Sequence, residues 1–189
     1  MTIIDSAASL ITYVFGNLAP YHLLFYSTLL GTELYQTFLN TKVCYLALPR
    51  SAFTTLQKRL FPIYFRGQTI LLLLTAVTFP PHGVFSLVKH KADWLPFTLA
   101  GVTAVLNLVV YGPRTQKAMV DCIHQETRDA QLRLNGGCGE ENMPSLEMQR
   151  LRKVFSRNHA MAIHLNLISI GAMVFYGWRF ASRLGVDVA

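Results

Sequence analysis

Several polar side chains that could carry chemistry stand inside long apolar stretches of the chain. Glu33, Gln36 and Asn40 follow one another at spacings of three and four, which places them on one face of a helix. Within a bilayer such groups are unfavourable unless they meet other helices or a polar site. The stripe therefore indicates either a hydrogen-bonded contact between helices or a place for a ligand.

A second ionisable group, Arg66, interrupts the apolar run 61–79. At about 1.5 Å of rise per residue, Glu33 and Arg66 lie at depths that an arginine side chain can bridge. The two would then form a buried ion pair. Alternatively, Arg66 extends to the membrane surface and Glu33 is protonated. The sequence leaves both possibilities open.

Later apolar runs carry further polar residues near their cytoplasmic ends. Because all four runs contribute such groups at similar depth, we expect one contiguous polar cluster in the cytoplasmic half of a bundle. Asparagine and histidine at helix ends also cap backbone groups, which is the competing interpretation. The candidate residues for a ligand site or polar cluster are Glu33, Gln36, Asn40, Arg66, Asn107, Arg114, His159 and Asn166.

Metal, haem and catalytic sites are not expected. His22 begins the first apolar run whereas His159 begins the fourth, so their depths differ by most of a bilayer. His164 follows His159 by five residues, not by the four that a chelating helical pair uses. No cofactor signature or nucleophile motif occurs, and we predict no bound cofactor.

Helices that cross a membrane must position these residues. Charged residues make up 14% of the 189 residues and gather between four apolar windows, 21–46, 61–79, 94–111 and 160–180. Each window is about long enough to span a bilayer as a helix. We predict an all-α polytopic membrane protein with one domain, 1–189, and a four-transmembrane-helix bundle. A long helical cytoplasmic loop, 114–158, joins the third and fourth helices, and residues 7–18 form a short interfacial helix.

The distribution of basic residues predicts the orientation. Thirteen of the seventeen Lys and Arg residues stand in or beside the first and third loops, which places those loops in the cytoplasm and both termini in the lumen or exterior. The basic loops, which give the chain its net charge of +7, then meet the anionic headgroups of the cytoplasmic membrane surface, and a nucleic-acid partner is not expected. The chain opens without a secretory or transit signal, so we expect the endoplasmic reticulum membrane. The basic residues left on the other side are Lys89, Lys91, Arg179 and Arg183.

Several segments together resemble a known family. Residues 31–65 read GTELYQTFLNTKVCYLALPRSAFTTLQKRLFPIYF, and the later segments are Asn107-Leu108, Gly112-Pro113-Arg114-Thr115, Phe155-Ser156-Arg157-Asn158-His159 and Asn166-Leu167. Their order and spacing are similar to those of the transmembrane protein 205-like family, over about residues 21–178. The resemblance implies a compact four-helix membrane protein and no agreed reaction, cofactor or substrate. The chain departs from the family at Ala160, where Gly is common.

Three classes of function fit these observations. The leading one is a non-enzymatic integral membrane protein whose polar residues bind a small molecule or lipid, or assemble with a membrane-protein partner or a second copy. The second is a small membrane transporter subunit, although four spans give no inverted repeat. The third is a membrane-embedded oxidoreductase with a bound cofactor, for which Glu33 or His159 would be the acid-base group. Cys44, Cys122 and Cys138 form no disulfide framework and are expected as free thiols.

Overall fold

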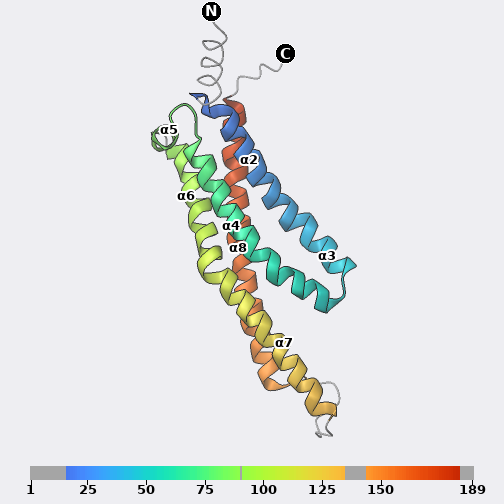
Figure 1. The fold of residues 1–189 in the computed structure, drawn as a ribbon. Coiled ribbons are helices and arrows are strands. Elements are labelled where there is room, and N and C mark those ends of the chain that lie inside the picture. The colour runs from blue at the N-terminus through green and yellow to red at the C-terminus, as the bar shows by residue number, and fades with distance from the viewer. Residues whose placement is uncertain (1–15, 90, 135–143, 184–189) are drawn as a thin grey trace, which may run out of the picture.

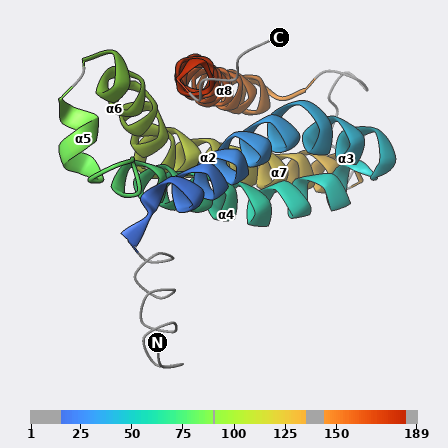
Figure 2. The same ribbon diagram turned by 90° about the horizontal axis from the view of Figure 1, so that it is seen from above.

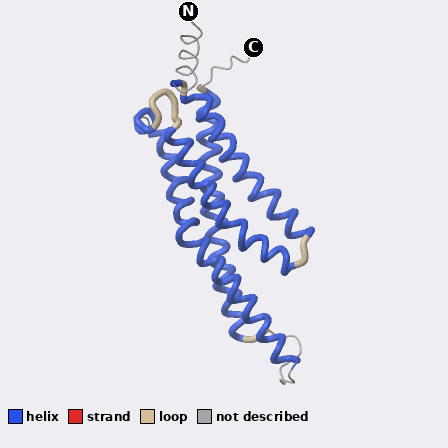
Figure 3. Tube along the Cα trace, in the orientation of Figure 1, coloured by secondary structure: helices blue, strands red, loops and turns tan. Residues whose placement is uncertain are grey.

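The computed structural model describes residues 16–89, 91–134 and 144–183, and every regular element among them is a helix (Figure 1, Figure 3). Four long helical rods run side by side in alternating directions. The start of the first rod and the end of the last lie at one end of the bundle, together with the connection between the second and third (Figure 1). The all-helical part of the sequence prediction is confirmed.

The first rod consists of three helical segments without a break, α2 (Leu18–Leu34), the π-helix η1 (Tyr35–Asn40) and α3 (Thr41–Ala47). The Asn17 side chain caps it by accepting a hydrogen bond from the Ala19 amide at 3.1 Å. A two-residue turn at Leu48 and Pro49 leads into the second rod, α4 (Arg50–Val77). Its helix begins well before the predicted window 61–79, because Pro49 precedes a run of polar residues that is helical but not apolar.

The third rod follows the short helix α5 (Val84–Val88) and comprises α6 (Lys91–Leu106), the π-helix η2 (Asn107–Tyr111) and α7 (Gly112–Leu134). The predicted window 94–111 ends at Gly112-Pro113, but the helix continues through these residues. Pro113 lacks an N–H, and its ring would collide with the carbonyl four residues earlier in a regular helix. The wider π turn just before it, in which the Gly112 N–H donates to the Asn107 carbonyl, accommodates the ring.

The fourth rod is α8 (Leu146–Ser182), which begins after the N-cap residue Ser145. The Ser145 hydroxyl accepts a hydrogen bond from the Met148 amide at 3.1 Å. Together α7 and the first half of α8 form a helical hairpin that extends beyond the rest of the bundle (Figure 1), where the loop 114–158 was predicted. The expected helix 7–18 lies largely outside the described residues.

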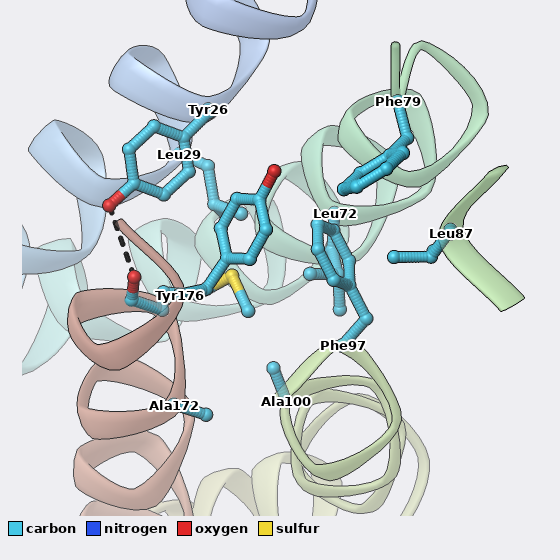
Figure 4. Packing of buried hydrophobic residues seen from close by; sticks show 10 residues of the cluster. Tyr26, Leu29, Leu72, Phe79, Leu87, Phe97, Ala100, Ala172 and Tyr176 are labelled. Carbon is cyan, nitrogen blue, oxygen red and sulfur yellow. Dashed lines mark hydrogen bonds between the residues drawn. The ribbon is translucent and has the colours of Figure 1, made fainter. Parts of the chain in front are cut away.

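Within the bundle α4 contacts both α2 and α6, and α8 contacts both α6 and α2. Viewed from above, α5 lies at the outer edge beside α6 (Figure 2). The apolar core fills the end of the bundle near α5 (Figure 4), and its members are Tyr26, Leu29, Leu72, Phe79, Leu87, Phe97, Ala100, Ala172, Met173 and Tyr176. The Tyr26 hydroxyl donates to the Met173 carbonyl at 3.0 Å. Gly177 permits this contact, because a Cβ there would overlap the Tyr26 hydroxyl.

Apolar side chains cover the outside of the rods while polar side chains fill parts of the interior. Leu73 and Val109 are 61% and 64% exposed, whereas Glu33 is 1% exposed and Asn107 is fully buried. A water-soluble protein has the opposite distribution. Three helices are long and apolar enough to cross a membrane, Arg50–Val77, Lys91–Leu134 and Leu146–Ser182. The chain is therefore a membrane protein.

The rod from Leu18 to Ala47 is also long enough for a bilayer, with segments of 17, 6 and 7 residues. It falls short on composition. The buried side chains His22, Glu33 and Gln36 belong to this rod and lower its hydropathy. The weak membrane signal of this rod thus comes from polar groups that it buries inside the bundle.

Candidate functional site

A network of polar side chains crosses the middle of the bundle. Glu33 on α2 is buried, and its Oε1 accepts hydrogen bonds from the Gln68 amide of α4 at 2.6 Å and from the Ser169 hydroxyl of α8 at 3.0 Å. The Gln68 Nε2 also lies 3.2 Å from the Ser169 Oγ. Glu33 thereby joins three of the four rods at one point.

Asn166 extends the network by one helical turn. Its Nδ2 donates to the Thr37 hydroxyl of η1 at 2.8 Å, and its Oδ1 accepts from the Tyr64 hydroxyl of α4 at 2.8 Å. Gln68 is a second donor to the same Oδ1 at 3.3 Å. We call these residues the central network: Glu33, Thr37, Tyr64, Gln68, Asn166 and Ser169.

The proposed ion pair between Glu33 and Arg66 is not formed. Gln68 is buried on α4, and Arg66 stands two residues earlier on the exposed side of the same helix. Side chains two positions apart on a helix point in nearly opposite directions. Of the two alternatives, the structure matches the one in which Arg66 faces outward and Glu33 has no cationic partner.

Two buried oxygens of the central network have no hydrogen-bond partner, Glu33 Oε2 and Gln68 Oε1. Both are acceptors when the carboxyl group is ionised, so neither can satisfy the other. A proton on Glu33 Oε2 supplies the missing donor. The Glu33 O–H can then donate to the Gln68 carbonyl oxygen, while the Gln68 N–H donates to Glu33 Oε1. The arrangement suits a neutral Glu33.

A second set of buried polar groups lies where α4 faces η2 and α7. Asn107 is fully buried, and its Nδ2 donates to the Ala162 carbonyl of α8 at 3.0 Å, while its Oδ1 has no partner. Ala162 lies one turn from Asn166, so the two asparagines reach neighbouring turns of α8. A Cβ added at Gly112 would lie 3.4 Å from the Phe65 ring, which shows how closely α4 approaches this segment.

Gln57 and Thr115 belong to the same interface. Gln57 on α4 is 2% exposed, and neither its Nε2 nor its Oε1 has a hydrogen-bond partner. The Thr115 hydroxyl on α7 is also buried without a hydrogen-bond partner. The next residue of each helix does make contact, since the Gln116 amide donates to the Lys58 carbonyl at 3.1 Å. We call Gln57, Asn107 and Thr115 the unpaired set. Its four free atoms include both donors and acceptors.

The remaining candidate residues are not part of one cluster. Gln36 and Asn40 bond to each other along their own rod at 2.7 Å. Arg114 is exposed on the first turn of α7, and His159 is half-buried and stacks on Phe155. The contiguous layer expected from Gln36, Asn40, Arg66, Asn107, His159 and Asn166 is not formed, because depth along a helix does not fix the direction of a side chain. Of the eight candidate residues, Glu33 and Asn166 belong to the central network, and Asn107 bonds to α8 one turn away.

His22 is fully buried at the other end of the bundle, with both ring nitrogens satisfied. The Thr75 carbonyl, 2.9 Å from Nδ1, is an acceptor only, so Nδ1 carries the proton. Nε2 then accepts from the Tyr176 hydroxyl at 2.5 Å. This histidine is a structural bridge between three rods. In the part of the chain that the structure describes, no three His, Cys, Asp or Glu side chains gather as metal ligands.

Sequence reasoning gave little weight to several residues that make the network. Tyr64 and Ser169 are ordinary residues of apolar helices by type, although Ser169 follows Asn166 by three positions and so shares its face. Gln57 stands eleven residues before Gln68, which is three turns and again the same face. That period was the signal available for Gln57. Chemically, the assembled groups can donate and accept hydrogen bonds and hold a proton.

Comparison with known proteins gives a family and a relative. Residues 24–124 match the family described as a domain of unknown function (DUF4149). The chain is similar to the "Xanthocillin biosynthesis cluster protein D" of Aspergillus fumigatus, with 44% identity over 169 residues, 89% of this chain and 92% of the relative. No solved structure matches the chain.

Proposed function

Because the chain belongs to the family described as a domain of unknown function (DUF4149), whose description assigns no activity, we propose its function from the geometry of the bundle. We propose a non-enzymatic membrane protein of the transmembrane protein 205-like type. It spans the membrane four times, and its unpaired set binds a small molecule or the polar part of a lipid. The central network holds the rods around that site.

One observation carries this proposal. The six unpaired, buried side-chain atoms of the described chain include two that a proton on Glu33 resolves, and the other four belong to Gln57, Asn107 and Thr115. A buried polar atom without a partner costs about 1–3 kcal/mol. Asn107 lies within the third apolar window, where the bilayer offers no water to make the missing bond, and Gln57 and Thr115 stand next to the second and third windows on the cytoplasmic side. Asn107 and Thr115 stand eight residues apart on one rod, about 12 Å along its axis. A ligand that satisfies all four atoms therefore carries several donors and acceptors spread over that length.

The burial of the polar groups favours ligand binding over contact with a second membrane protein through these groups. Glu33, Gln68 and Asn107 are each at most 1% exposed, so a second membrane protein could reach them only if the bundle opened. A membrane partner would instead meet the apolar outer faces. Contact with membrane lipids follows from those same faces.

The similar fungal protein is named for a biosynthesis cluster. We propose that this chain likewise serves small-molecule biosynthesis at a membrane, by holding a precursor or product and not by converting it. The distribution of Lys and Arg supports cytoplasmic placement of the α3–α4 turn and of the α7–α8 hairpin, with both termini in the lumen of the endoplasmic reticulum or the exterior.

Native mass spectrometry of the full-length protein, purified in a mild detergent, tests the binding proposal. The wild type is expected to carry an added mass that Gln57→Met and Asn107→Leu lose. Gln149→Met is the matched control, because Gln149 is an exposed glutamine at the start of α8 whose amide donates to the Pro144 carbonyl. Retention of the same mass by Gln57→Met and by Asn107→Leu would refute a ligand at the unpaired set.

A further inference from the structure

A pocket of about 630 Å³ lies where α8 ends, and none of its lining residues belongs to the unpaired set. Its lining comes from three places in the sequence, the residue after α5, the first turn of α6 and the last turns of α8. The lining residues are Lys89, Lys91, Ala92, Arg179 and Arg183. The four basic residues that the orientation analysis left outside the cytoplasm therefore line a single pocket.

The pocket is positively charged although it contains one carboxylate. Asp93 is fully buried beneath it and lies 2.7 and 2.8 Å from the Arg183 Nη2 and 3.4 Å from the Arg179 Nη2. One carboxylate against four cationic side chains leaves an excess of about three positive charges. Within the described chain neither Lys89 nor Lys91 forms an ion pair.

Asp93 also fixes the shape of the pocket. A buried carboxylate that binds the same Nη2 through both oxygens holds the Arg183 guanidinium in one orientation. The Arg179 and Arg183 side chains nevertheless remain 32% and 45% exposed, so part of each guanidinium still faces the pocket. A planar guanidinium held in place is suited to the oxygens of a phosphate, and the two lysines add charge without a demand on geometry.

Apolar side chains with high exposure stand on the same short elements. Phe85 and Val88 of α5 are 82% and 61% exposed, Leu95 of α6 is 58% exposed, and Trp178 of α8 is 77% exposed. Aromatic rings beside basic groups are typical of the boundary between headgroups and acyl chains. A soluble anion would contact only the basic side chains, whereas a lipid would contact the basic side chains with its headgroup and the exposed apolar side chains with its acyl chains.

We propose that this pocket binds the phosphate of an anionic phospholipid, with the acyl chains along the exposed apolar side chains of α5, α6 and α8. The volume is in the range of known small-ligand sites. The site is distinct from the unpaired set, and the proposal does not depend on the ligand proposed there. Its effect is to tie the end of the bundle with the termini to the headgroup layer.

The test is lipid retention by the full-length protein in a zwitterionic detergent, measured by native mass spectrometry. Phosphatidylglycerol and phosphatidylcholine with the same acyl chains are the two probes. We expect the wild type to prefer phosphatidylglycerol, and Lys89→Gln with Lys91→Gln to weaken that preference roughly tenfold or more, since each lysine near an anionic headgroup adds a similar increment. The arginines are left intact, because their removal would leave Asp93 buried and unpaired.

The matched control is Lys58→Gln with Arg59→Gln, two adjacent basic residues of α4 outside this pocket. It is expected to retain the preference, and equal melting temperatures of both double variants exclude unfolding as a cause. Equal retention of the two lipids by the wild type, or an unchanged preference in the Lys89 and Lys91 variant, would overturn the proposal. A third arm adds inorganic phosphate, and displacement of the lipid at millimolar phosphate would assign the pocket to a soluble anion instead.

Discussion

Two glutamines of α4 allow the two polar groups of the bundle to be separated by stability measurements. Gln68 donates to Glu33 at 2.6 Å and lies within 3.3 Å of Ser169 and Asn166, whereas Gln57 makes no hydrogen bond. Methionine has nearly the volume of glutamine and no polar amide. Gln68→Met and Gln57→Met are therefore the same chemical change in opposite hydrogen-bonding environments.

The magnitudes follow from the contacts. A hydrogen bond between membrane helices contributes about 0.6 kcal/mol on average and up to about 1.7. The Gln68 amide has two hydrogens, so Gln68→Met is expected to lower the free energy of unfolding by about 1–3 kcal/mol. Gln57→Met loses no bond and removes an unpaired amide, so the ligand-free protein is expected to be unchanged or more stable by about 1–3 kcal/mol.

The assay is denaturant unfolding in one detergent, measured by circular dichroism after exhaustive detergent exchange has removed bound molecules. The sign of the change distinguishes the two glutamines. Destabilisation of the washed Gln57→Met protein by as much as Gln68→Met would mean that Gln57 has partners within the bundle. The assignment of the unpaired set as a ligand site would then be refuted.

Three further predictions concern packing, charge and pH. Gly177→Ala is expected to cost about 1–3 kcal/mol in the same assay because its Cβ would overlap a tyrosine hydroxyl, whereas Gly171→Ala, whose Cβ meets nothing within 4 Å, should be neutral or slightly stabilising. Glu33→Gln and Arg66→Met should change stability additively, since the two residues do not pair, and a coupling above about 0.5 kcal/mol would contradict the observed geometry. The Asp129 carboxyl accepts hydrogen bonds from the serine at the start of α8 and from a glutamine one turn away on α7, which hold its pKa below the usual range. Because the folded pKa is lowered, the ionised Asp129 stabilises the α7–α8 contact at pH values above the unfolded pKa of about 3.9, and this stabilisation is lost as the pH falls through the folded pKa. A pKa of Asp129 at or above 3.9 in an NMR titration would contradict this.

The helices could be predicted from the sequence because their apolar windows are long. The first window, 21–46, matches the rod from Leu18 to Ala47 closely. The ends of α4 and of the third rod could not be predicted from the apolar windows, since both helices continue into polar sequence beyond those windows. At Pro113 the sequence shows a breaker, but only the structure shows the π turn that absorbs it.

The candidate site could be predicted only in part, for a reason of geometry. The sequence gives the depth of Glu33 and Arg66, but their directions depend on how each rod is rotated against its neighbours. The buried face of α4 carries Gln57, Tyr64 and Gln68. Arg66 does not share that face, and this helical period would have excluded it as a partner of Glu33. Hydrogen bonds across rods, such as that from Tyr64 to Asn166, depend on packing that no single-helix pattern contains.

The central claim is that the unpaired set holds a ligand within a membrane-spanning bundle. A density map of the full-length protein in lipid nanodiscs tests it most directly. The account predicts density within hydrogen-bonding distance of Gln57, Asn107 and Thr115 that the side chains do not explain, with the four rods inside the disc. A map in which these three side chains hydrogen-bond to one another across a tightly packed interface, with no added density, would contradict it.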